Sequence, residues 1–195
     1  MRDRAEQDLE VVEQALKGAP DGFRSLVERY QRPVFSIILR LVRDRATTED
    51  LAQEAFLKAF RALDSFDRRR KFSSWLFAIA HNTAIDHLRK RVLDTVPLET
   101  GDDQRDPIDV VAGPATESPE SAAISGDLAR CFEVALAELR PEYAEVLTLR
   151  FGEGLAYDEI AEVVGLPLGT VKTHLYRARR RLADRLRSMG WGEDD

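Results

Sequence analysis

Apolar side chains recur every three or four positions between residues 23 and 91, which is the spacing of amphipathic helices. The first stretch is one long helix or a pair broken at Pro33, with apolar positions Phe23, Leu26, Val27, Tyr30, Val34, Ile37, Ile38 and Leu41. A second has Thr47 and Asp50 spaced as a capping box, and apolar positions Leu51, Ala55, Phe56, Ala59, Phe60 and Leu63. A third passes through Leu76, Ile79, Ala80, Ile85 and Leu88 to basic residues ending at Arg91.

The segment 155–186 has the pattern of a helix-turn-helix. A short helix is expected near 157–164, followed by a turn at Gly165, where a left-handed backbone costs little. A second helix opens at Gly169, with its apolar face on Val171, Leu175, Ala178 and Leu182. Its other face is polar and basic, as insertion into a DNA major groove requires, and carries Lys172, Thr173, Tyr176, Arg177, Arg180 and Arg181. A solvated helical hairpin with an ordinary charged face is the alternative.

No alternating strand pattern of useful length appears, so we expect an all-α protein of two small helical domains joined by a flexible acidic linker. The domain boundaries are predicted at 1–92, 93–120 and 121–190. The linker contains four prolines and lacks an apolar period, and the next helix is expected to start around Pro119. Between Asp94 and Glu120 there are eight acidic residues and one basic residue, so this segment has a net charge of −7. The whole chain has a net charge of −6, so the rest of it has a net charge of +1. Because phosphate neutralisation supplies most non-specific DNA affinity, the chain should bind DNA mainly in the company of a partner.

The loop 64–72, DSFDRRRKF, places aromatic rings among four consecutive cations. Such a mixture suits single-stranded DNA, because cations follow the backbone while rings stack on unpaired bases. The plainer interpretation is that Phe66, Phe72 and Trp75 are core residues and the arginines are solvated. On the helix before this loop, Leu57 lies off the apolar stripe among polar residues, which indicates a surface for a partner helix.

The sequence shows no residue pattern for covalent chemistry. Cys131 is the single cysteine, and the histidines His81, His87 and His174 lack the spacing of a metal site or a catalytic triad. We therefore expect no enzyme activity, no cofactor and no metal. The N-terminus lacks a signal-like apolar run and no stretch approaches a membrane span, so we expect a cytoplasmic protein.

The chain resembles the extracytoplasmic-function (ECF) group of bacterial sigma factors, in the sigma-70 superfamily. EDLAQEAFLKAFRALDSF followed by KFSSWLFAIAHNTAIDHLRKR is similar to sigma region 2, and LRPEYAEVLTLRFGEGLAYDEIAEVVGLPLGTVKTHLYRARRRL is similar to region 4. The resemblance covers about residues 22–91 and 127–188, with only a short linker between. It implies that the chain binds core RNA polymerase, directs it to promoters and assists promoter melting.

Carried over residue by residue, the resemblance also implies site roles. The set that docks on the clamp helices of the polymerase largest subunit is Asp50, Gln53, Glu54 and Leu57. The set that captures unpaired bases of the minus-ten element is Phe66, Arg68, Arg69, Arg70, Lys71 and Asn82. The set that reads the minus-thirty-five element as duplex is Lys172, Thr173, His174 and Arg177, and the set suited to phosphates is Arg150, Arg179, Arg180 and Arg181. The family further implies the polymerase flap and an anti-sigma factor as partners.

Other classes of protein compete with this interpretation. A free-standing helix-turn-helix regulator would need operator affinity without polymerase, and the acidic linker argues against it. A regulator that binds polymerase without melting promoters would lack the aromatic and basic loop residues, which are present. A helical scaffold without a DNA role leaves the basic stripe 172–181 unexplained.

Overall fold

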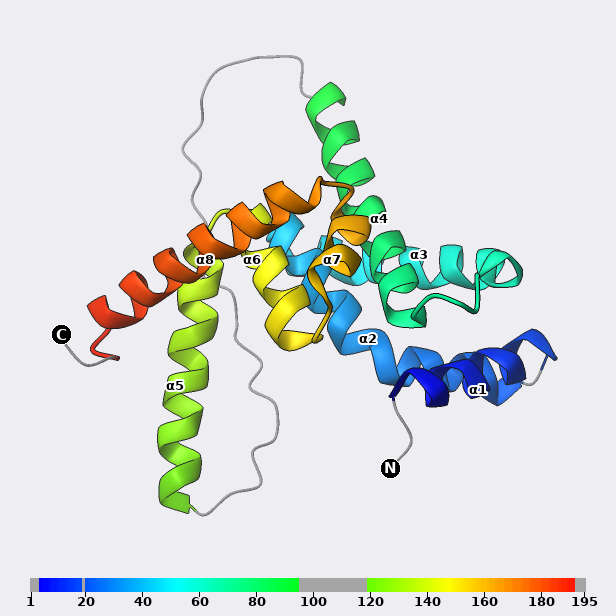
Figure 1. Cartoon of the computed structure of the whole chain (residues 1–195), viewed down its shortest axis with the longest axis horizontal. Helices are drawn as coiled ribbons and strands as arrows, with labels where there is room; N and C mark the ends of the chain where they lie inside the picture. The colour runs from blue at the N-terminus through cyan, green and yellow to red at the C-terminus, as the bar shows by residue number, and fades with distance from the viewer. Residues whose placement is uncertain (1–3, 19, 95–118, 192–195) are drawn as a thin grey trace.

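The computed structural model describes residues 4–18, 20–94 and 119–191, and within these ranges the chain is helical without any strand. The N-terminal half consists of α1 (Arg4–Leu16), α2 (Pro20–Val42), α3 (Arg45–Ala62), the 3-10 turn η1 (Leu63–Ser65) and α4 (Phe72–Asp94). The C-terminal half consists of α5 (Pro119–Glu138), α6 (Pro141–Leu147), the π-turn η2 (Thr148–Gly152), α7 (Tyr157–Val164) and α8 (Leu168–Ser188) (Figure 1). The expected all-α architecture is confirmed.

Helix α2 is the centre of the N-terminal half. It continues through Pro33 as one helix, so the long-helix alternative holds, and α1, α3 and α4 all pack on it. Its predicted apolar stripe is buried, from Leu26 through Tyr30 to Ile38. Sequence reasoning left α1 unassigned, although the helical spacing of Leu9, Val12 and Leu16 was a signal for it.

A buried carboxylate fixes α1 against α2. Asp8 on α1 is buried and accepts hydrogen bonds from the Tyr30 hydroxyl and the Arg29 guanidinium. Because a buried charge is costly unless paired and hydrogen-bonded, these partners set where α1 lies.

The predicted cap of α3 was wrong by one turn. Helix α3 begins at Arg45, and its N-cap is Asp44, whose carboxylate accepts the backbone N–H of Thr47 at 2.7 Å. An extended backbone at Asp44 aims its side chain at the open end of the helix, whereas Thr47 already lies inside the first turn. Hydrogen bonds from Thr47 hold the pKa of Asp44 below its ordinary value of 3.8.

The helix-turn-helix forms where the sequence predicted it. Helix α7 covers Tyr157–Val164, and Gly165 follows with a φ of 65°, the left-handed conformation that glycine adopts without a Cβ penalty. Helix α8 begins at Leu168 and buries Val171, Leu175, Ala178 and Leu182. Helix α8 packs on α7 and on α6, and it presents its remaining faces outward.

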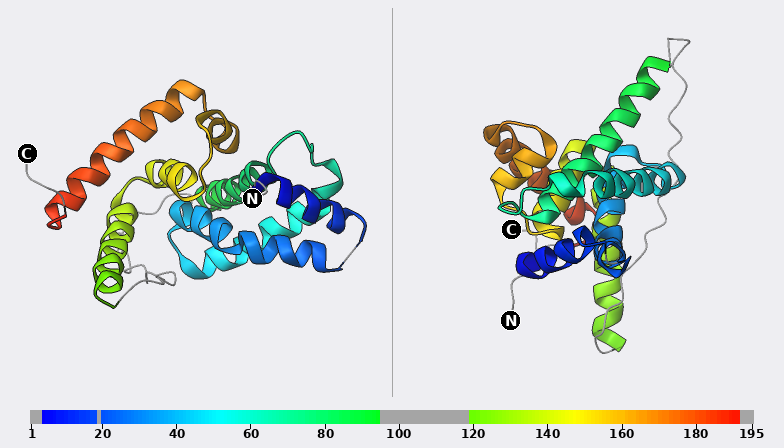
Figure 2. Two further views of the ribbon diagram at one scale, coloured as in Figure 1. Left: turned by 60° about the horizontal axis from the view of Figure 1, so that its bottom comes forward. Right: turned by 90° about the vertical axis from the view of Figure 1, so that its right-hand side faces the viewer.

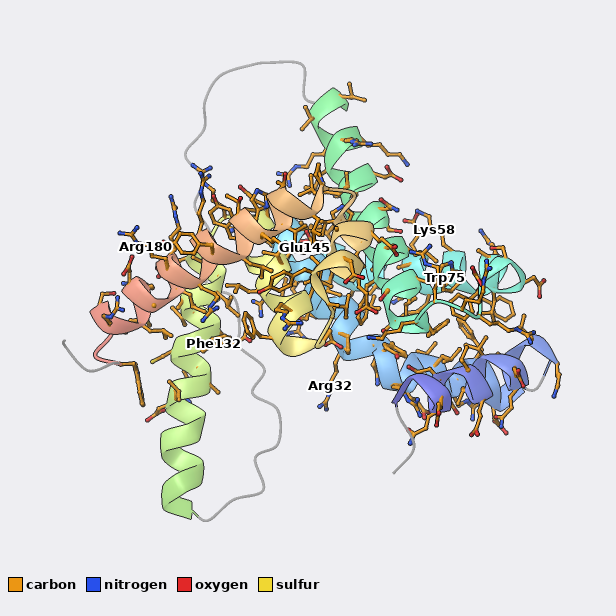
Figure 3. All side chains as sticks on the ribbon, viewed as in Figure 1. Arg32, Lys58, Trp75, Phe132, Glu145 and Arg180 are labelled. Carbon is orange, nitrogen blue, oxygen red and sulfur yellow. The ribbon has the colours of Figure 1, made fainter. Side chains whose placement is uncertain are left out.

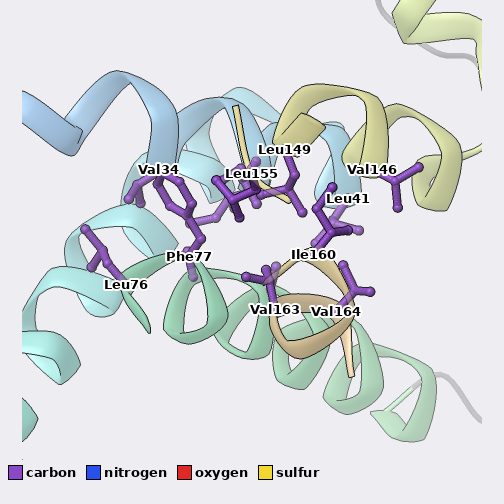
Figure 4. Packing of buried hydrophobic residues seen from close by; sticks show 14 of the residues in the cluster. Val34, Leu41, Leu76, Phe77, Val146, Leu149, Leu155, Ile160, Val163 and Val164 are labelled. Atoms are coloured by element: carbon purple, nitrogen blue, oxygen red, sulfur yellow. The ribbon is translucent and has the colours of Figure 1, made fainter. Parts of the chain in front are cut away.

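The two halves are packed together, which sequence reasoning did not foresee. Helix α7 lies on α4 and α6 lies on α2, and the two further views agree on this arrangement (Figure 2). Buried side chains from both halves form one apolar cluster, in which Leu41 and Phe77 of the N-terminal half lie close to Leu149 and Ile160 of the C-terminal half (Figure 4).

The predicted linker, 93–120, lies largely outside the described residues, although α5 does begin at Pro119 as expected. Among the residues that the structure describes, no helix is long and apolar enough to cross a membrane. Within those same residues, no group of histidine, cysteine and acidic side chains is arranged to hold a metal ion.

Candidate functional site

The outer face of α3 carries an exposed stripe of polar and apolar side chains. Asp50, Gln53, Glu54 and Leu57 are all exposed, as a docking surface requires. Leu57 is 55% exposed, and Phe60, one turn further, is 54% exposed. Sequence reasoning had placed Phe60 in the core, but more than half of its side chain is exposed, and its ring packs edgewise with that of Phe23, at 4.8 Å between centroids. We call the five residues Asp50, Gln53, Glu54, Leu57 and Phe60 the α3 stripe.

Glu54 in this stripe is tied to its own domain. Its carboxylate lies 2.8 Å from Nζ of Lys58, which also donates to the hydroxyl of the buried Thr83 on α4 at 3.2 Å. The hydrogen bond from Lys58 holds the pKa of Glu54 below its usual value. Glu54 therefore orients Lys58 between α3 and α4 in addition to facing solvent.

The aromatic residues of the loop after α3 form a packed cluster. Phe66 is only 7% exposed, and its ring lies 5.5 Å from that of Phe72 and 5.3 Å from that of Trp75. The assignment of Phe66 to base stacking is therefore corrected: burying its ring between two others leaves no face for a base. Trp75 remains half-buried at the edge of the cluster (Figure 3).

The cations of the loop point outward above this cluster. Arg68, Arg69, Arg70 and Lys71 are exposed, and Asn82 is exposed further along α4. Arg69 folds back on Asp67, at 2.8 Å, and this hydrogen-bonded contact lowers the pKa of Asp67 to about 2. The four residues Arg68–Lys71 are called the basic loop below.

Helix α8 presents the expected reading face to solvent. Lys172, Thr173 and Arg177 are exposed, and so is Tyr176, which is 68% exposed beside Arg177. Thr173 donates its hydroxyl to the carbonyl of Gly169 at 2.9 Å. Exposed cations and an aromatic ring along one helix supply the donors and apolar contacts that major-groove reading uses.

Two predicted DNA residues are instead engaged within the domain. The ring of His174 is half-buried against Tyr143, 5.3 Å between centroids, so it faces α6 rather than the outer surface of α8. Arg150 donates to the carbonyl of Leu155 at 2.8 Å and lies over the ring of Tyr157. Both side chains therefore also pack within the helix-turn-helix, and their DNA contacts stay predictions.

A basic depression lies between α6 and α8. Its volume is about 630 Å³, and it is lined by Arg140, Tyr143, Tyr176, Arg177, Arg180, Arg181 and Asp184. Arg180 lies on the outer surface of α8 (Figure 3), and Arg181 lies over the ring of Tyr143. Arg179 is exposed too, beside the exposed ring of Phe151. Sequence reasoning missed Arg140, which is exposed at the start of α6 and widens the positive surface.

Family models match both halves of the chain. Residues 26–92 match sigma-70 region 2, and residues 129–182 match sigma-70 region 4. These two matches, in the same order as the two helical halves, define a sigma factor of the sigma-70 type.

Relatives narrow this class to one group. The chain is 33% identical over 180 residues to the ECF RNA polymerase sigma factor SigW of Bacillus subtilis, covering 91% of this chain and 96% of that protein. It is 36% identical to the RNA polymerase sigma-H factor of Pseudomonas aeruginosa, covering 94% and 96%, and 34% identical to the ECF sigma-E factor of Escherichia coli, covering 93% and 95%. The chain belongs to the ECF RNA polymerase sigma factors.

Two solved structures share the fold. CnrH, solved in complex with the cytosolic domain of CnrY, superposes with a TM-score of 0.61 at 25% identity, covering 93% of this chain and 97% of that one. RpoE of Bartonella quintana, solved with the anti-sigma factor NepR, superposes with a TM-score of 0.62 at 26% identity, covering 85% and 96%.

Proposed function

We propose that the protein is an ECF sigma factor that binds core RNA polymerase, directs it to specific promoters and helps to melt them. The observation that carries this function is the presence, on one chain of this family, of three separate exposed surfaces: the α3 stripe, the basic loop and the outer face of α8. Each surface has the chemistry of a different contact in transcription initiation.

The α3 stripe is the proposed docking surface for the clamp helices of the polymerase largest subunit. Exposed Leu57 and Phe60 offer an apolar centre, and Asp50, Gln53 and Glu54 offer a polar and acidic rim. Interfaces commonly combine an apolar centre that excludes water with a polar rim, and the acidic rim favours a basic partner.

The basic loop is the proposed capture site for the melted minus-ten strand. Its cations follow the phosphate backbone, while Asn82 supplies an amide for base edges. Phe66 and Phe72 hold the loop from beneath, and only the exposed edge of Trp75 is placed to meet a base. Contacts made to the open strand offset the few kcal/mol that unstacking costs.

The outer face of α8 is the proposed reader of the minus-thirty-five element. Lys172, Thr173 and Arg177 contact base edges, and Tyr176 supplies an apolar contact beside them. The phosphate contacts come from Arg140, Arg179, Arg180 and Arg181, which surround this face and the neighbouring depression. Phosphate contacts position the helix, whereas base contacts give sequence preference.

An anti-sigma factor is a further proposed partner, since one structural relative was solved with such a protein. We place the protein in the cytoplasm, where its polymerase and promoters are, and assign it no enzyme activity. A free-standing regulator is disfavoured, because such a protein has no use for the α3 stripe.

Transcription in vitro tests the function directly. Core polymerase with and without the purified protein is presented with a library of genomic fragments, and transcript start sites are sequenced. We expect specific starts only when both proteins are present, with a shared upstream motif. Specific binding to the same fragments without polymerase would instead support the free-standing regulator.

A further inference from the structure

Each cation of the basic loop has a carboxylate partner from this same chain. Arg68 lies 3.5 Å from Glu13 of α1, and Arg69 lies 2.8 Å from Asp67 within the loop. Arg70 pairs with Glu162, and Nζ of Lys71 lies 3.0 Å from Oε1 of Glu159. The proposed strand-capture site is therefore occupied by internal anions.

The two partners lie on one side of α7, and Glu159 is also held by its own helix. Glu159 is only 18% exposed, and its other oxygen accepts the backbone N–H of Ala156 at 2.7 Å, which closes the first turn of α7. Glu162 follows three residues later on the same side of the helix, and the opposite side of α7 is buried through Ile160, Val163 and Val164. Because α7 packs on α4, its carboxylates lie directly beside the loop.

Polar contacts elsewhere hold the two halves in this arrangement. Arg40 of α2 lies 2.5 Å from Glu133 of α5, and Arg43 donates to the carbonyl of Leu139. His81 of α4 lies 2.6 Å from Glu145 of α6. The apolar cluster shared by both halves adds to these contacts.

We propose that α7 is an internal competitor of the DNA strand, whose two carboxylates take the place of phosphates on the basic loop. The inference rests on the proposed role of this loop in strand capture and adds a regulation of that site. Strand and α7 use the same cations, so the C-terminal half moves off α4 when the strand binds. The outer face of α8 is exposed in the same arrangement, so duplex reading stays available while strand capture is blocked.

The competition between α7 and the strand is expected to be weak and reversible. Exposed ion pairs are individually weak, so loss of both α7 pairs should strengthen strand binding by about three- to tenfold. Coupling between two sites is reciprocal, so a strand that binds better to the open form must also open the chain. Salt screens exposed pairs, and raising the ionic strength should therefore open the chain without DNA.

The test compares wild type with a double variant of the full chain that carries both Glu159→Gln and Glu162→Gln. Glutamine keeps an oxygen for the N–H of Ala156, so α7 retains its first turn. The control is Asp158→Asn, which removes one charge from an exposed position of α7 that makes no ion pair within the described residues. Melting temperatures of all forms verify that they fold.

Two readouts separate opening from simple electrostatics. The first readout is the affinity for oligothymidylate, which is measured by fluorescence anisotropy. The second is the separation of the two halves, which is measured by energy transfer between two dyes. The dyes are attached at Ser25→Cys and Ser188→Cys in a chain that also carries Cys131→Ser. We expect the double variant to bind the strand about three- to tenfold more tightly and to be more open without DNA. We expect the strand to open wild type, and Asp158→Asn to match wild type in both readouts.

Several results would overturn the proposal. One is tighter strand binding with unchanged energy transfer, because the strand would then bind without opening. Another is equal binding by wild type and by a chain with Arg70→Ala and Lys71→Ala. Failure of the proposed function appears separately, as absence of polymerase-dependent transcription, and leaves the energy-transfer result of the charge variants interpretable.

Discussion

Nδ1 of His81 lies 2.6 Å from Oε1 of Glu145, and this contact joins α4 of the N-terminal half to α6 of the C-terminal half. Both side chains are largely buried, and only 3% of the Glu145 side chain is exposed. Glu145 lies at the centre of the molecule, between the two halves (Figure 3). A polar pair at this place depends on the halves staying together.

The first prediction concerns this pair. Glu145→Ala leaves the His81 ring nitrogen without its partner, at a cost of about 1–3 kcal/mol while the halves are together. Water satisfies that nitrogen once the halves separate, so the variant should open rather than unfold. Small-angle scattering should show a larger radius of gyration with little loss of helical circular dichroism. Glu142→Gln, on the same helix, is the control, and an unchanged radius for Glu145→Ala would contradict the expectation.

The second prediction concerns docking. Asp50→Lys combined with Leu57→Ala should weaken binding to core polymerase by at least about tenfold, because it reverses the rim charge and removes the apolar centre. Both positions are exposed, so the free energy of unfolding should change by only about 0.5 kcal/mol. Glu54 is unsuitable for charge reversal, since a lysine there would repel Lys58. Glu49→Gln is the control, and undiminished polymerase binding by the folded double variant would remove the docking role.

The third prediction concerns sequence reading by α8. Arg177→Ala should cost about 1–3 kcal/mol and relax preference at one position of the minus-thirty-five element. Arg181→Ala should weaken binding evenly across sequences and lower the salt slope by about one, because it removes a phosphate contact. Holoenzyme binding to a panel of single-base variants measures both. Equal losses that are independent of sequence for the two variants would argue against base reading by Arg177.

The fourth prediction concerns promoter opening. Alanine at Arg68, Arg69 and Arg70 together should slow opening while polymerase binding and duplex recognition are kept. A template with a pre-melted bubble should restore much of the rate, because the unstacking cost is already met. Arg24→Ala, at an exposed arginine of α2, is the control. A defect of equal size on the bubble template would show that these cations act at another step.

The fifth prediction concerns the cap of α3. The pKa of Asp44 is lowered in the folded chain by hydrogen bonds from Thr47, so its ionised form stabilises the fold. That stabilisation is fully present above the ordinary pKa of 3.8 and is lost as the pH falls through the lower, folded pKa. Asp44→Ala should therefore lower the melting temperature at neutral pH, and the difference from wild type should shrink below pH 3.8. Asp44→Asn, which still caps, should lie between the two at neutral pH.

The sequence by itself determined the local architecture. Helical spacing of apolar residues located α2, α3, α4 and α8, because that spacing places one face of each helix in a core. Gly165 marked the turn of the helix-turn-helix, because only a residue without a Cβ takes its left-handed backbone cheaply. The exposure of Asp50, Gln53, Glu54 and Leu57 on α3, and of Lys172 and Arg177 on α8, followed from the same periodicity, whereas that of Phe60 did not.

Only the tertiary structure decided which of the other predicted site residues are exposed and available to contact nucleic acid. Phe66, His174 and Arg150 have the composition of nucleic-acid contacts, yet each finds a ring or a carbonyl within its own half, which a one-dimensional pattern does not show. The pairing of Arg70 and Lys71 with Glu162 and Glu159 joins positions far apart in the chain. Such contacts depend on how two helical halves pack together, and that packing is set by the combined shape of many side chains rather than by the period of any one helix.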